Sequence, residues 1–274
     1  MHSDFYPETG DLDAKHYRDH SQLQYAFAQE ALKTIALRGD ESILDVGCGD
    51  GKITAQLAGM VPQGRVIGVD KSEAMVAFAQ ESFPRDWYPN LKFERQNAVE
   101  LDFTEPFDLI ICFGCMHWIK DQRAVFEKMK TLLKPLGKVV VLTLQRKSSF
   151  WKAIDQVVMR EKWWGYFKDP VPYQFLREKE YKELADLVGL DWVSCQTSVR
   201  EIRFSGKRDL ENYIRGWLPY LIHLPKRLHN VFLEEIGNKS LEFAPEDDEG
   251  CVTHTSDTLA LTLSKTLEPE CPEC

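Results

Sequence analysis

A glycine-rich segment carries the strongest chemical signal in this sequence. The segment contains Asp45, Gly47, Gly49 and Gly51. Asp45 lies within the apolar run 43–46, and the glycines follow that run directly. Glycines there let the backbone turn sharply and approach a ligand that a Cβ atom would obstruct. A second apolar run, 66–69, ends at Asp70, whose carboxylate could accept hydrogen bonds from a ribose. The spacing therefore predicts a binding site for a nucleoside-containing ligand.

The charge near this loop separates two kinds of ligand. A dinucleotide places its pyrophosphate at the start of the helix after the loop, and Asp45 would repel it. The same carboxylate would attract the positively charged amino group of S-adenosylmethionine. Asn97 and Ala98 follow the apolar run 91–95. The side-chain amide at this position could form hydrogen bonds with the edge of an adenine. These residues favour S-adenosylmethionine.

The elements that must position these residues alternate along the chain. Strands are expected at 43–46, 66–70, 91–95, 107–113, 138–144, 191–204 and 255–265, and helices at 52–60, 121–133 and 178–187. Strands that alternate with helices are typical of parallel sheets with helices on both faces. The predicted fold is α/β, with a Rossmann-like, seven-stranded, mostly parallel sheet and inserted helical lid segments.

Two aromatic-rich insertions interrupt the alternation and divide the chain. We expect one domain over 1–274. It would comprise an N-terminal helical lid (1–40), a cofactor-binding half (41–144), two substrate-cap insertions (145–177 and 207–245) and an acidic tail (266–274). Both insertions flank the strand expected at 191–204, so both would lie beyond one edge of the sheet. They could enclose a ligand there, or pack onto the sheet as plain structure.

The glycine loop, Asp70, Asn97-Ala98 and the run Phe107-Asp108-Leu109-Ile110 together resemble the motifs of class I S-adenosylmethionine-dependent methyltransferases. The resemblance covers about Tyr17 to Leu144, although most relatives carry aspartate at the position of Asn97. The residues predicted to bind the cofactor are Tyr17, Asp45, Gly47, Gly49, Gly51, Asp70, Lys71, Asn97, Ala98 and Phe113.

A narrower resemblance begins after the fourth expected strand, in the segment from Gly114 to Asp121. Its His-Trp-x-x-Asp pattern is similar to the trans-aconitate, malonyl carrier-protein and juvenile hormone acid methyltransferases, which all methylate carboxylates. Segments 21–24 and 213–218 resemble the juvenile hormone and trans-aconitate enzymes, respectively. The predicted catalytic residues are His117, Trp118, Gln24 and Arg215.

Each of these four residues also has a plain structural interpretation. His117 would form a hydrogen bond with the acceptor, or only with nearby backbone. Trp118 would line the pocket beside the transferred methyl group, or only pack against neighbouring side chains. Gln24 would touch the acceptor or lie on a helix surface. Arg215 would anchor an acid through its planar guanidinium, or remain a solvated surface residue. A carboxylate is ionised at neutral pH, so alignment and exclusion of water suffice and no strong base is needed.

Composition and net charge limit the classes of partner that the chain could bind. The net charge of −9 disfavours nucleic acid, and no window is apolar enough for a membrane helix. We expect a cytoplasmic monomer or weak dimer whose substrate is a small-molecule acid. We also expect reduced cysteines and no bound metal. Cys271 and Cys274 have the spacing of metal ligands, but they stand in the acidic tail. The alternatives are N- or C-methylation of another metabolite, or cofactor binding without turnover.

Overall fold

A seven-stranded sheet organises the chain in the computed structural model, which describes residues 18, 21–147, 149–167 and 174–266. The strands are β1 (Ser42–Val46), β2 (Arg65–Asp70), β3 (Leu91–Arg95), β4 (Phe107–Phe113), β5 (Leu133–Gln145), β6 (Asp191–Phe204) and β7 (Val252–Ser264). Their spatial order is β3-β2-β1-β4-β5-β7-β6. β1 to β5 pair in parallel, and β7 lies antiparallel between β5 and β6. The predicted Rossmann-like, mostly parallel sheet is confirmed.

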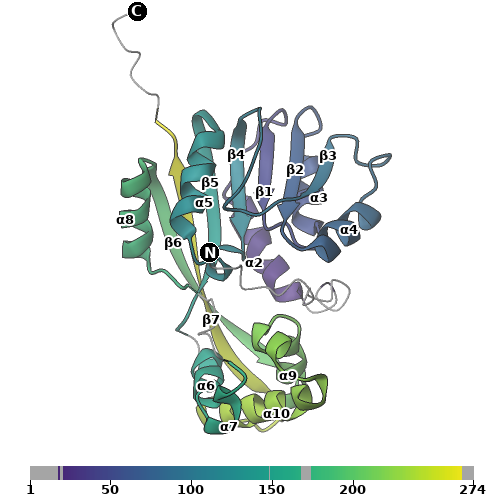
Figure 1. Cartoon of the computed structure of the whole chain (residues 1–274), viewed down its shortest axis with the longest axis vertical. Helices are drawn as coiled ribbons and strands as arrows, with labels where there is room; N and C mark the ends of the chain where they lie inside the picture. Colours follow the sequence, from purple (N-terminus) through teal and green to yellow (C-terminus); the bar gives the residue numbers. More distant parts are fainter. Residues whose placement is uncertain (1–17, 19–20, 148, 168–173, 267–274) are drawn as a thin grey trace, which may run out of the picture.

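Helices cover both faces of this sheet (Figure 1). They are α2 (Gln22–Lys33), α3 (Lys52–Met60), α4 (Glu73–Ser82), α5 (Gln122–Leu132) and α8 (Glu178–Val188). Side chains alternate along a strand, so Leu44 of β1 joins the core under α5 and α8, whereas Ile43 joins the core under α3 and α4. Two apolar layers therefore hold β1 rigidly at the centre of the sheet.

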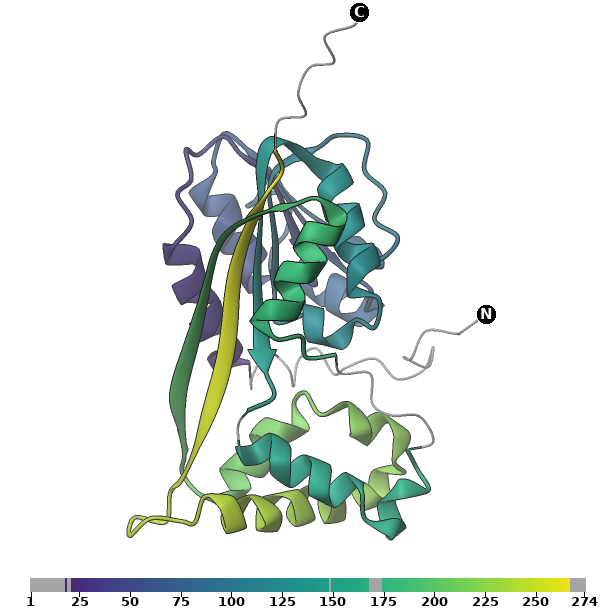
Figure 2. The same ribbon diagram turned by 90° about the vertical axis from the view of Figure 1, so that its left-hand side faces the viewer.

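A cluster of helices lies beyond the carboxyl ends of the parallel strands (Figures 1 and 2). This helical cluster comprises α6 (Ser149–Val158), α7 (Glu161–Trp164), α9 (Lys207–Arg215), η2 (Pro219–His223) and α10 (Lys226–Phe243). It has a core of its own, in which Trp151, Trp163, Trp217 and Phe232 are buried. Both predicted insertions thus contribute helices to one structure, and α2 lies between that structure and the sheet.

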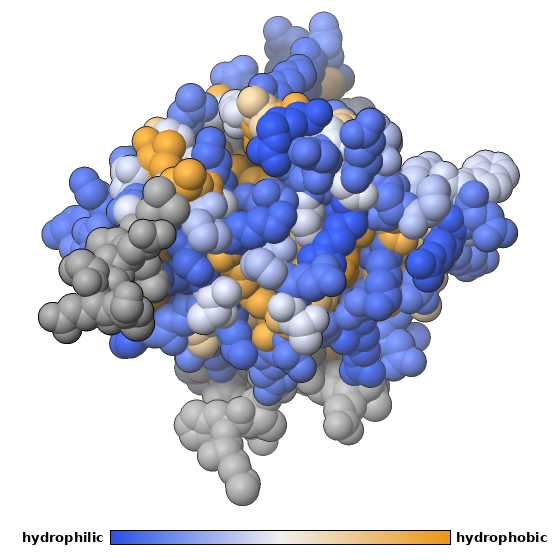
Figure 3. Space-filling model, turned by 90° about the horizontal axis from the view of Figure 1, so that it is seen from above, coloured by the Kyte–Doolittle hydropathy of each residue, from blue (hydrophilic) through white to orange (hydrophobic). Residues whose placement is uncertain are grey.

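β6 and β7 connect the sheet to the helical cluster. Residues 257–264 of β7 pair with both β5 and β6, whereas residues 252–256 extend past the end of β5 and pair only with β6. The two strands continue to the helical cluster as a ribbon (Figure 2). The opposite end of the molecule is mainly hydrophilic (Figure 3). Among the described helices, none is long and apolar enough to cross a membrane.

Two element boundaries differ from the expectations. The helix expected at 121–133 ends at Leu132, and β5 begins at Leu133, which pairs with Phe107 five residues before the expected start of that strand. A turn at Leu136, with φ of 63°, interrupts the register, so periodicity alone does not reveal the extension. β7 begins at Val252 because its polar first half pairs with β6.

Candidate active site

The glycine loop joins β1 to α3 at the carboxyl edge of the sheet. Gly47, Gly49 and Gly51 all have positive φ, at 79°, 53° and 80°. A Cβ atom on Gly51 would lie 2.7 Å from Cζ of Phe93, and one on Gly47 would lie 2.5 Å from Sγ of Cys115. Conformation and close packing therefore both require glycine at these two positions.

Asp70, at the end of β2, holds this loop in place. Its Oδ2 accepts a hydrogen bond from the Gly49 backbone N–H at 3.0 Å, and its Oδ1 accepts one from Ser72 at 2.9 Å. The Gly47 and Cys48 backbone N–H groups donate to the Val69 carbonyl at 2.8 and 3.0 Å. The loop is thus fixed against the adjacent strand before any ligand binds.

Asp45 is the buried acid beneath the loop. Its side chain is almost fully enclosed, and Oδ2 accepts a hydrogen bond from the Thr54 hydroxyl at 2.7 Å. Burial raises the pKa of Asp45 to about 7, the Thr54 bond opposes that rise, and the negative charges of Asp70 and Asp50 add to it. Three carboxylates near one loop make this region electronegative.

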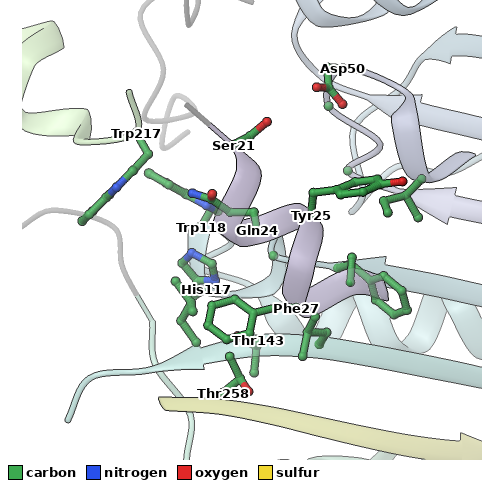
Figure 4. Close-up of a pocket in the computed structure, with 18 of the residues that line it drawn as sticks. Ser21, Gln24, Tyr25, Phe27, Asp50, His117, Trp118, Thr143, Trp217 and Thr258 are labelled. Carbon is green, nitrogen blue, oxygen red and sulfur yellow. The ribbon is translucent and has the colours of Figure 1, made fainter. Parts of the chain in front are cut away.

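A pocket lies between this loop and the helical cluster. It encloses about 1060 Å³ of empty space, including its open mouth. Its walls come from α2, the glycine loop, the segment after β4, the end of β5, and one or two side chains each from α6, α9 and β7. In Figure 4, Asp50 and Trp217 lie on opposite sides of the pocket, with Gln24, Trp118 and His117 between them.

The structure brings only part of the predicted set together. Gln24, Asp45, Gly47, Gly49, Phe113, His117 and Trp118 all line the pocket. The other described members lie elsewhere: Gly51 at the start of α3, Asp70 behind the loop, Lys71 exposed after β2, Asn97 and Ala98 after β3, and Arg215 on α9. Tyr17 lies outside the described residues. The functional roles assigned to all of these residues stay predictions.

Three of the residues outside the pocket have other contacts. Asn97 Oδ1 accepts a hydrogen bond from the Val99 backbone at 3.4 Å, and Ala98 packs against the core under α5. Arg215 donates to Asn230 Oδ1 at 2.7 Å, from α9 to α10. This contact directs the Arg215 guanidinium toward the helical cluster.

His117 is the central polar side chain of the pocket wall. It lies in η1 (Met116–Trp118), is 3 % exposed, and stacks on the Phe175 ring with centroids 5.5 Å apart and a 12° interplanar angle. Burial lowers the pKa of His117 to about 3. The Gln174 backbone N–H donates to its carbonyl at 2.9 Å. His117 is therefore a neutral imidazole held between aromatic rings.

Gln24 reaches the same wall from α2. Its Oε1 is buried and has no hydrogen-bond partner within the described part of the chain. A buried amide oxygen without a partner is costly, so this position suits a ligand that supplies a donor or an ordered water. This geometry fits the predicted contact of Gln24 with a bound molecule.

The sequence analysis missed several residues that line the pocket. They are Ser21, Tyr25, Phe27, Ala28, Cys48, Asp50, Lys52, Ile53, Gly114, Leu142, Thr143, Leu144 and Thr258. Phe150, Tyr213 and Trp217 also line it. The sequence placed Phe150 only in an aromatic-rich insertion, and placed Tyr213 and Trp217 in the segment 213–218 that resembles the trans-aconitate enzyme. The periodicity of α2 could have indicated Phe27 and Ala28 as one buried face, but only tertiary packing aims that face at the glycine loop.

The pocket is electrostatically divided. Its charged residues within the described part of the chain are Asp45, Asp50 and Lys52, all on the glycine-loop side. Lys52 Nζ lies 3.1 Å from Asp50 Oδ2 and donates to the Arg18 carbonyl at 3.2 Å. The other side consists of His117, Trp118, Phe150, Tyr213 and Trp217. One side therefore suits a cation and the other an apolar group.

This fold and this loop define a methyltransferase. The family model for the methyltransferase domain matches residues 37–186, which is more than half of the chain. The chain therefore belongs to this family. It is an S-adenosylmethionine-dependent methyltransferase, as the glycine loop predicts.

The chain is also similar to curated enzymes. It is 27 % identical to juvenile hormone acid O-methyltransferase of Bombyx mori over 237 residues, which cover 80 % of this chain and 82 % of that protein. It is 32 % identical to trans-aconitate 2-methyltransferase of Escherichia coli over 146 residues, about half of each chain. The first similarity covers most of both chains, whereas the second covers about half of each.

Solved structures share the fold at low sequence identity. Phosphoethanolamine N-methyltransferase 2 of Haemonchus contortus, solved with S-adenosylhomocysteine and a phosphorylated amine, has a TM-score of 0.60 and 18 % identity. The match covers 93 % of this chain and 58 % of that one. It supports the architecture alone.

Proposed function

We propose that this methyltransferase transfers a methyl group from S-adenosylmethionine to a carboxylate of a small acid with apolar bulk. The observation that carries the proposal is the electrostatic division of the pocket. Acidic groups gather on the glycine-loop side, and aromatic, uncharged groups face them. A cationic cofactor and an apolar acid fit the two sides in one orientation only.

The residues on the glycine-loop side fit this cofactor. The buried Asp45 carboxylate has a raised pKa because nothing positive compensates its burial. An ammonium group beside it would stabilise its charged form and lower that pKa. Asp70 stands at the end of β2, where it would meet the ribose, and Phe113 would flank the ligand from β4. When bound, the cofactor supplies a methyl group on a positively charged sulfur.

The acceptor must arrive already deprotonated. His117 is the imidazole of the acceptor side, and a pKa near 3 makes it too weak a base to remove a proton from a hydroxyl or an ammonium at neutral pH. A carboxylate needs no such step, because its oxygen carries the lone pair and the charge at neutral pH. The neutral imidazole of His117 and the Gln24 amide would orient the acceptor by hydrogen bonds.

The aromatic side would exclude water. Trp217 packs against Phe150, Trp151 and Tyr213, with ring centroids 5.1–5.9 Å apart. Removing water strengthens the attraction between a carboxylate and a sulfonium, and holding both in contact replaces a bimolecular encounter. These rings would therefore bind the apolar part of the acid and also exclude water from the reacting atoms.

The arginine contacts favour an acid with a single carboxylate. Arginines of the two insertions and of β6 could anchor further carboxylates, but each has a partner of its own. Arg146, Arg160, Arg177, Arg203 and Arg215 form ion pairs or hydrogen bonds with Asp155, Glu235, Glu180, Asp247 and Asn230, respectively. None of these arginines, nor Lys147, is among the described residues that line the pocket. On the side of the pocket opposite the glycine loop, a second or third carboxylate would find no cation among the described lining residues, whereas an alkyl or isoprenoid-like chain would find aromatic rings.

An amine acceptor fits less well. N-methylation of a tertiary amine leaves a permanent cation, and a carboxylate near the acceptor would stabilise that charge. The described carboxylates of the pocket all lie on the glycine-loop side. The juvenile hormone acid enzymes, which resemble this chain over most of its length, are named for a carboxylic acid substrate.

The test is a panel of acceptors with S-adenosylmethionine, read by mass spectrometry of the products. The panel contains medium- and long-chain monocarboxylic acids, tricarboxylic acids, and amines of matched size. We expect methyl esters from the apolar monoacids with at least tenfold higher kcat/KM than from the tricarboxylic acids. Products from amines alone would overturn the proposal. Cofactor binding without any product would indicate a protein that binds without turnover.

A further inference from the structure

The helix α2 reaches over the pocket, and its two ends are held differently. Near its carboxyl end, Ala31 and Leu32 are buried in the core clusters beside the sheet. Near its start, Ser21, Gln24 and Tyr25 line the pocket and meet the glycine loop. Movement of that first turn would change how far the pocket is enclosed. The contacts at the middle of α2 therefore decide how firmly the pocket is covered.

One side chain from β6 contacts the middle of α2 twice. Arg200 forms an ion pair with Glu30, and its guanidinium carbon lies 5.2 Å from the centroid of the Phe27 ring. Phe27 itself lines the pocket and is 5 % exposed. The contact bridges two elements that are about 170 residues apart in the sequence. It joins the covering helix to the ribbon that also reaches the helical cluster.

Opposite this contact, α2 is held by α3. Gln29 and Gln56 exchange hydrogen bonds between their side-chain amides, and the Tyr25 hydroxyl donates to Gln56 at 3.3 Å. These contacts and the ion pair are partly exposed, and the Arg200 and Glu30 side chains are 29 % and 51 % exposed. Exposed polar contacts of this kind are individually weak, so they can break and reform without unfolding the core.

We propose that Arg200 is a positioning residue that holds α2 over the pocket, so that Gln24 and Phe27 face the bound ligands. This inference rests on the proposed function, because it takes the pocket to be where cofactor and acid bind. Arg200 lies outside the pocket and touches neither ligand. Its loss should shorten the residence of ligands and raise KM, and should leave kcat nearly unchanged.

The first experiment measures α2 directly, in the ligand-free full-length protein. Hydrogen exchange of peptides covering residues 22–33 is compared between wild type, Arg200→Gln, Glu30→Gln and the exchanged pair Arg200→Glu with Glu30→Arg. We expect exchange about fivefold faster in Arg200→Gln, which loses both the ion pair and the cation–π contact, and a smaller increase in Glu30→Gln, which loses the ion pair alone. The exchanged pair should slow it again at least partly, since the charges still attract.

Arg203→Gln is the matched control. Arg203 lies three residues further along β6 and also pairs with carboxylates, at Asp247 and Glu249, but it does not contact α2. This variant should leave exchange in 22–33 unchanged. Equal exchange in wild type and Arg200→Gln, or an exchanged pair no slower than the single variants, would overturn the role of Arg200.

A second measurement separates this inference from the proposed function. The dissociation rate of S-adenosylhomocysteine, followed by stopped flow, should rise about fivefold in Arg200→Gln and fall back in the exchanged pair. Because no acceptor is present, a wrong assignment of the acid would not alter this result. If wild type binds no S-adenosylhomocysteine, the proposed function fails, and hydrogen exchange still decides the role of Arg200.

Discussion

The Thr54 hydroxyl donates a hydrogen bond of 2.7 Å to the Asp45 carboxylate, and both side chains are buried beneath the glycine loop. Thr54 belongs to α3 and Asp45 to β1, so the bond fixes the helix that follows the loop to the strand that precedes it. One hydrogen bond only partly compensates a buried negative charge. The ligand-free protein therefore keeps an ionisable group at a cost that a cationic ligand would offset.

The first prediction concerns Asp45→Asn. The folded-state pKa of Asp45, about 7, exceeds the ordinary value of 3.8, so stability falls as pH rises between these values and stays reduced above pH 7. At pH 8 the variant should unfold at a higher urea concentration than wild type, whereas at pH 4 the two should be nearly equal. Its affinity for S-adenosylhomocysteine in calorimetry should fall about 10- to 100-fold, because a charged hydrogen bond is lost.

Asp108→Asn is the control, and its expected effect on stability at pH 8 is opposite to that of Asp45→Asn. Hydrogen bonds from Lys134 and the Ser42 backbone lower the pKa of Asp108 against the effect of burial. That variant should be less stable at pH 8 and bind the cofactor normally. An Asp45→Asn protein that is destabilised at pH 8, or that binds with full affinity, would contradict the account of Asp45.

The second prediction concerns pH and His117. Burial lowers the pKa of His117 to about 3 and that of His254 to about 4, below the ordinary histidine value of 6.5. The unfolded chain then binds more protons, so stability is full above pH 6.5 and is lost as pH falls toward these lower values. Between pH 7 and pH 5, urea unfolding should show a loss of about 2 kcal/mol for each of these histidines. The substitution His117→Gln should remove the part of this stability loss that protonation of His117 causes.

The pH profile of wild-type kcat/KM should have no inflection near pH 6.5 that arises from titration of His117. His117→Gln should lower kcat/KM while keeping the shape of the pH profile. A profile that loses an inflection near pH 6.5 on this substitution would show that His117 titrates in the working enzyme, and the proposed neutral role would be wrong.

The third prediction concerns the length of the acid. Trp217 separates the pocket from the core of the helical cluster, so Trp217→Leu should open space at that end. Each additional buried CH₂ group contributes about 0.8 kcal/mol, roughly fourfold in affinity. We expect the preferred monoacid to lengthen by two or more carbons, measured as kcat/KM over a homologous series. Trp163→Leu, a buried tryptophan of the same cluster that does not line the pocket, should weaken stability and keep the preference.

The fourth prediction tests the glycine loop. Gly51→Ala places a Cβ atom 2.7 Å from Phe93 and 2.9 Å from Ala79 at a φ of +80°, so it should destabilise the protein by about 1–3 kcal/mol and weaken cofactor binding. Gly59→Ala is the control, because a Cβ atom there meets nothing within 4 Å and alanine favours the α3 helix. Thermal unfolding should separate the two variants, and equal melting temperatures would contradict the requirement for glycine at position 51.

Much of the cofactor side could be predicted because its signals are local. Gly47, Gly49 and Gly51 have positive φ values, which their residue type indicates in the sequence. Asp45 lies within one recognisable apolar run, and Asp70 ends another. The continuous run Leu109-Ile110-Ile111 marks β4 as buried on both faces, and it is. These features depend on neighbours within a few residues.

The acceptor side depends on contacts that no local pattern contains. Phe27 reaches the pocket because α2 packs on β5, and Thr258 because β7 inserts antiparallel between β5 and β6. Cys112 and Cys115 share the C-x-x-C spacing of the tail cysteines, and the structure places their thiols within hydrogen-bonding reach of each other behind the loop. Arg215 matched a motif, yet its guanidinium bonds Asn230 instead of lining the pocket.

The ribbon of β6 and β7 has an evolutionary consequence. Side chains along a strand alternate between faces, so inserting or deleting one residue in β7 before Thr258 would turn Val252, His254 and Ser256 to the opposite side. Such a change would move buried residues of the helical cluster into solvent. Lineages that acquire new acids should therefore vary by substitution in α6 and α9, and keep the lengths of these two strands constant.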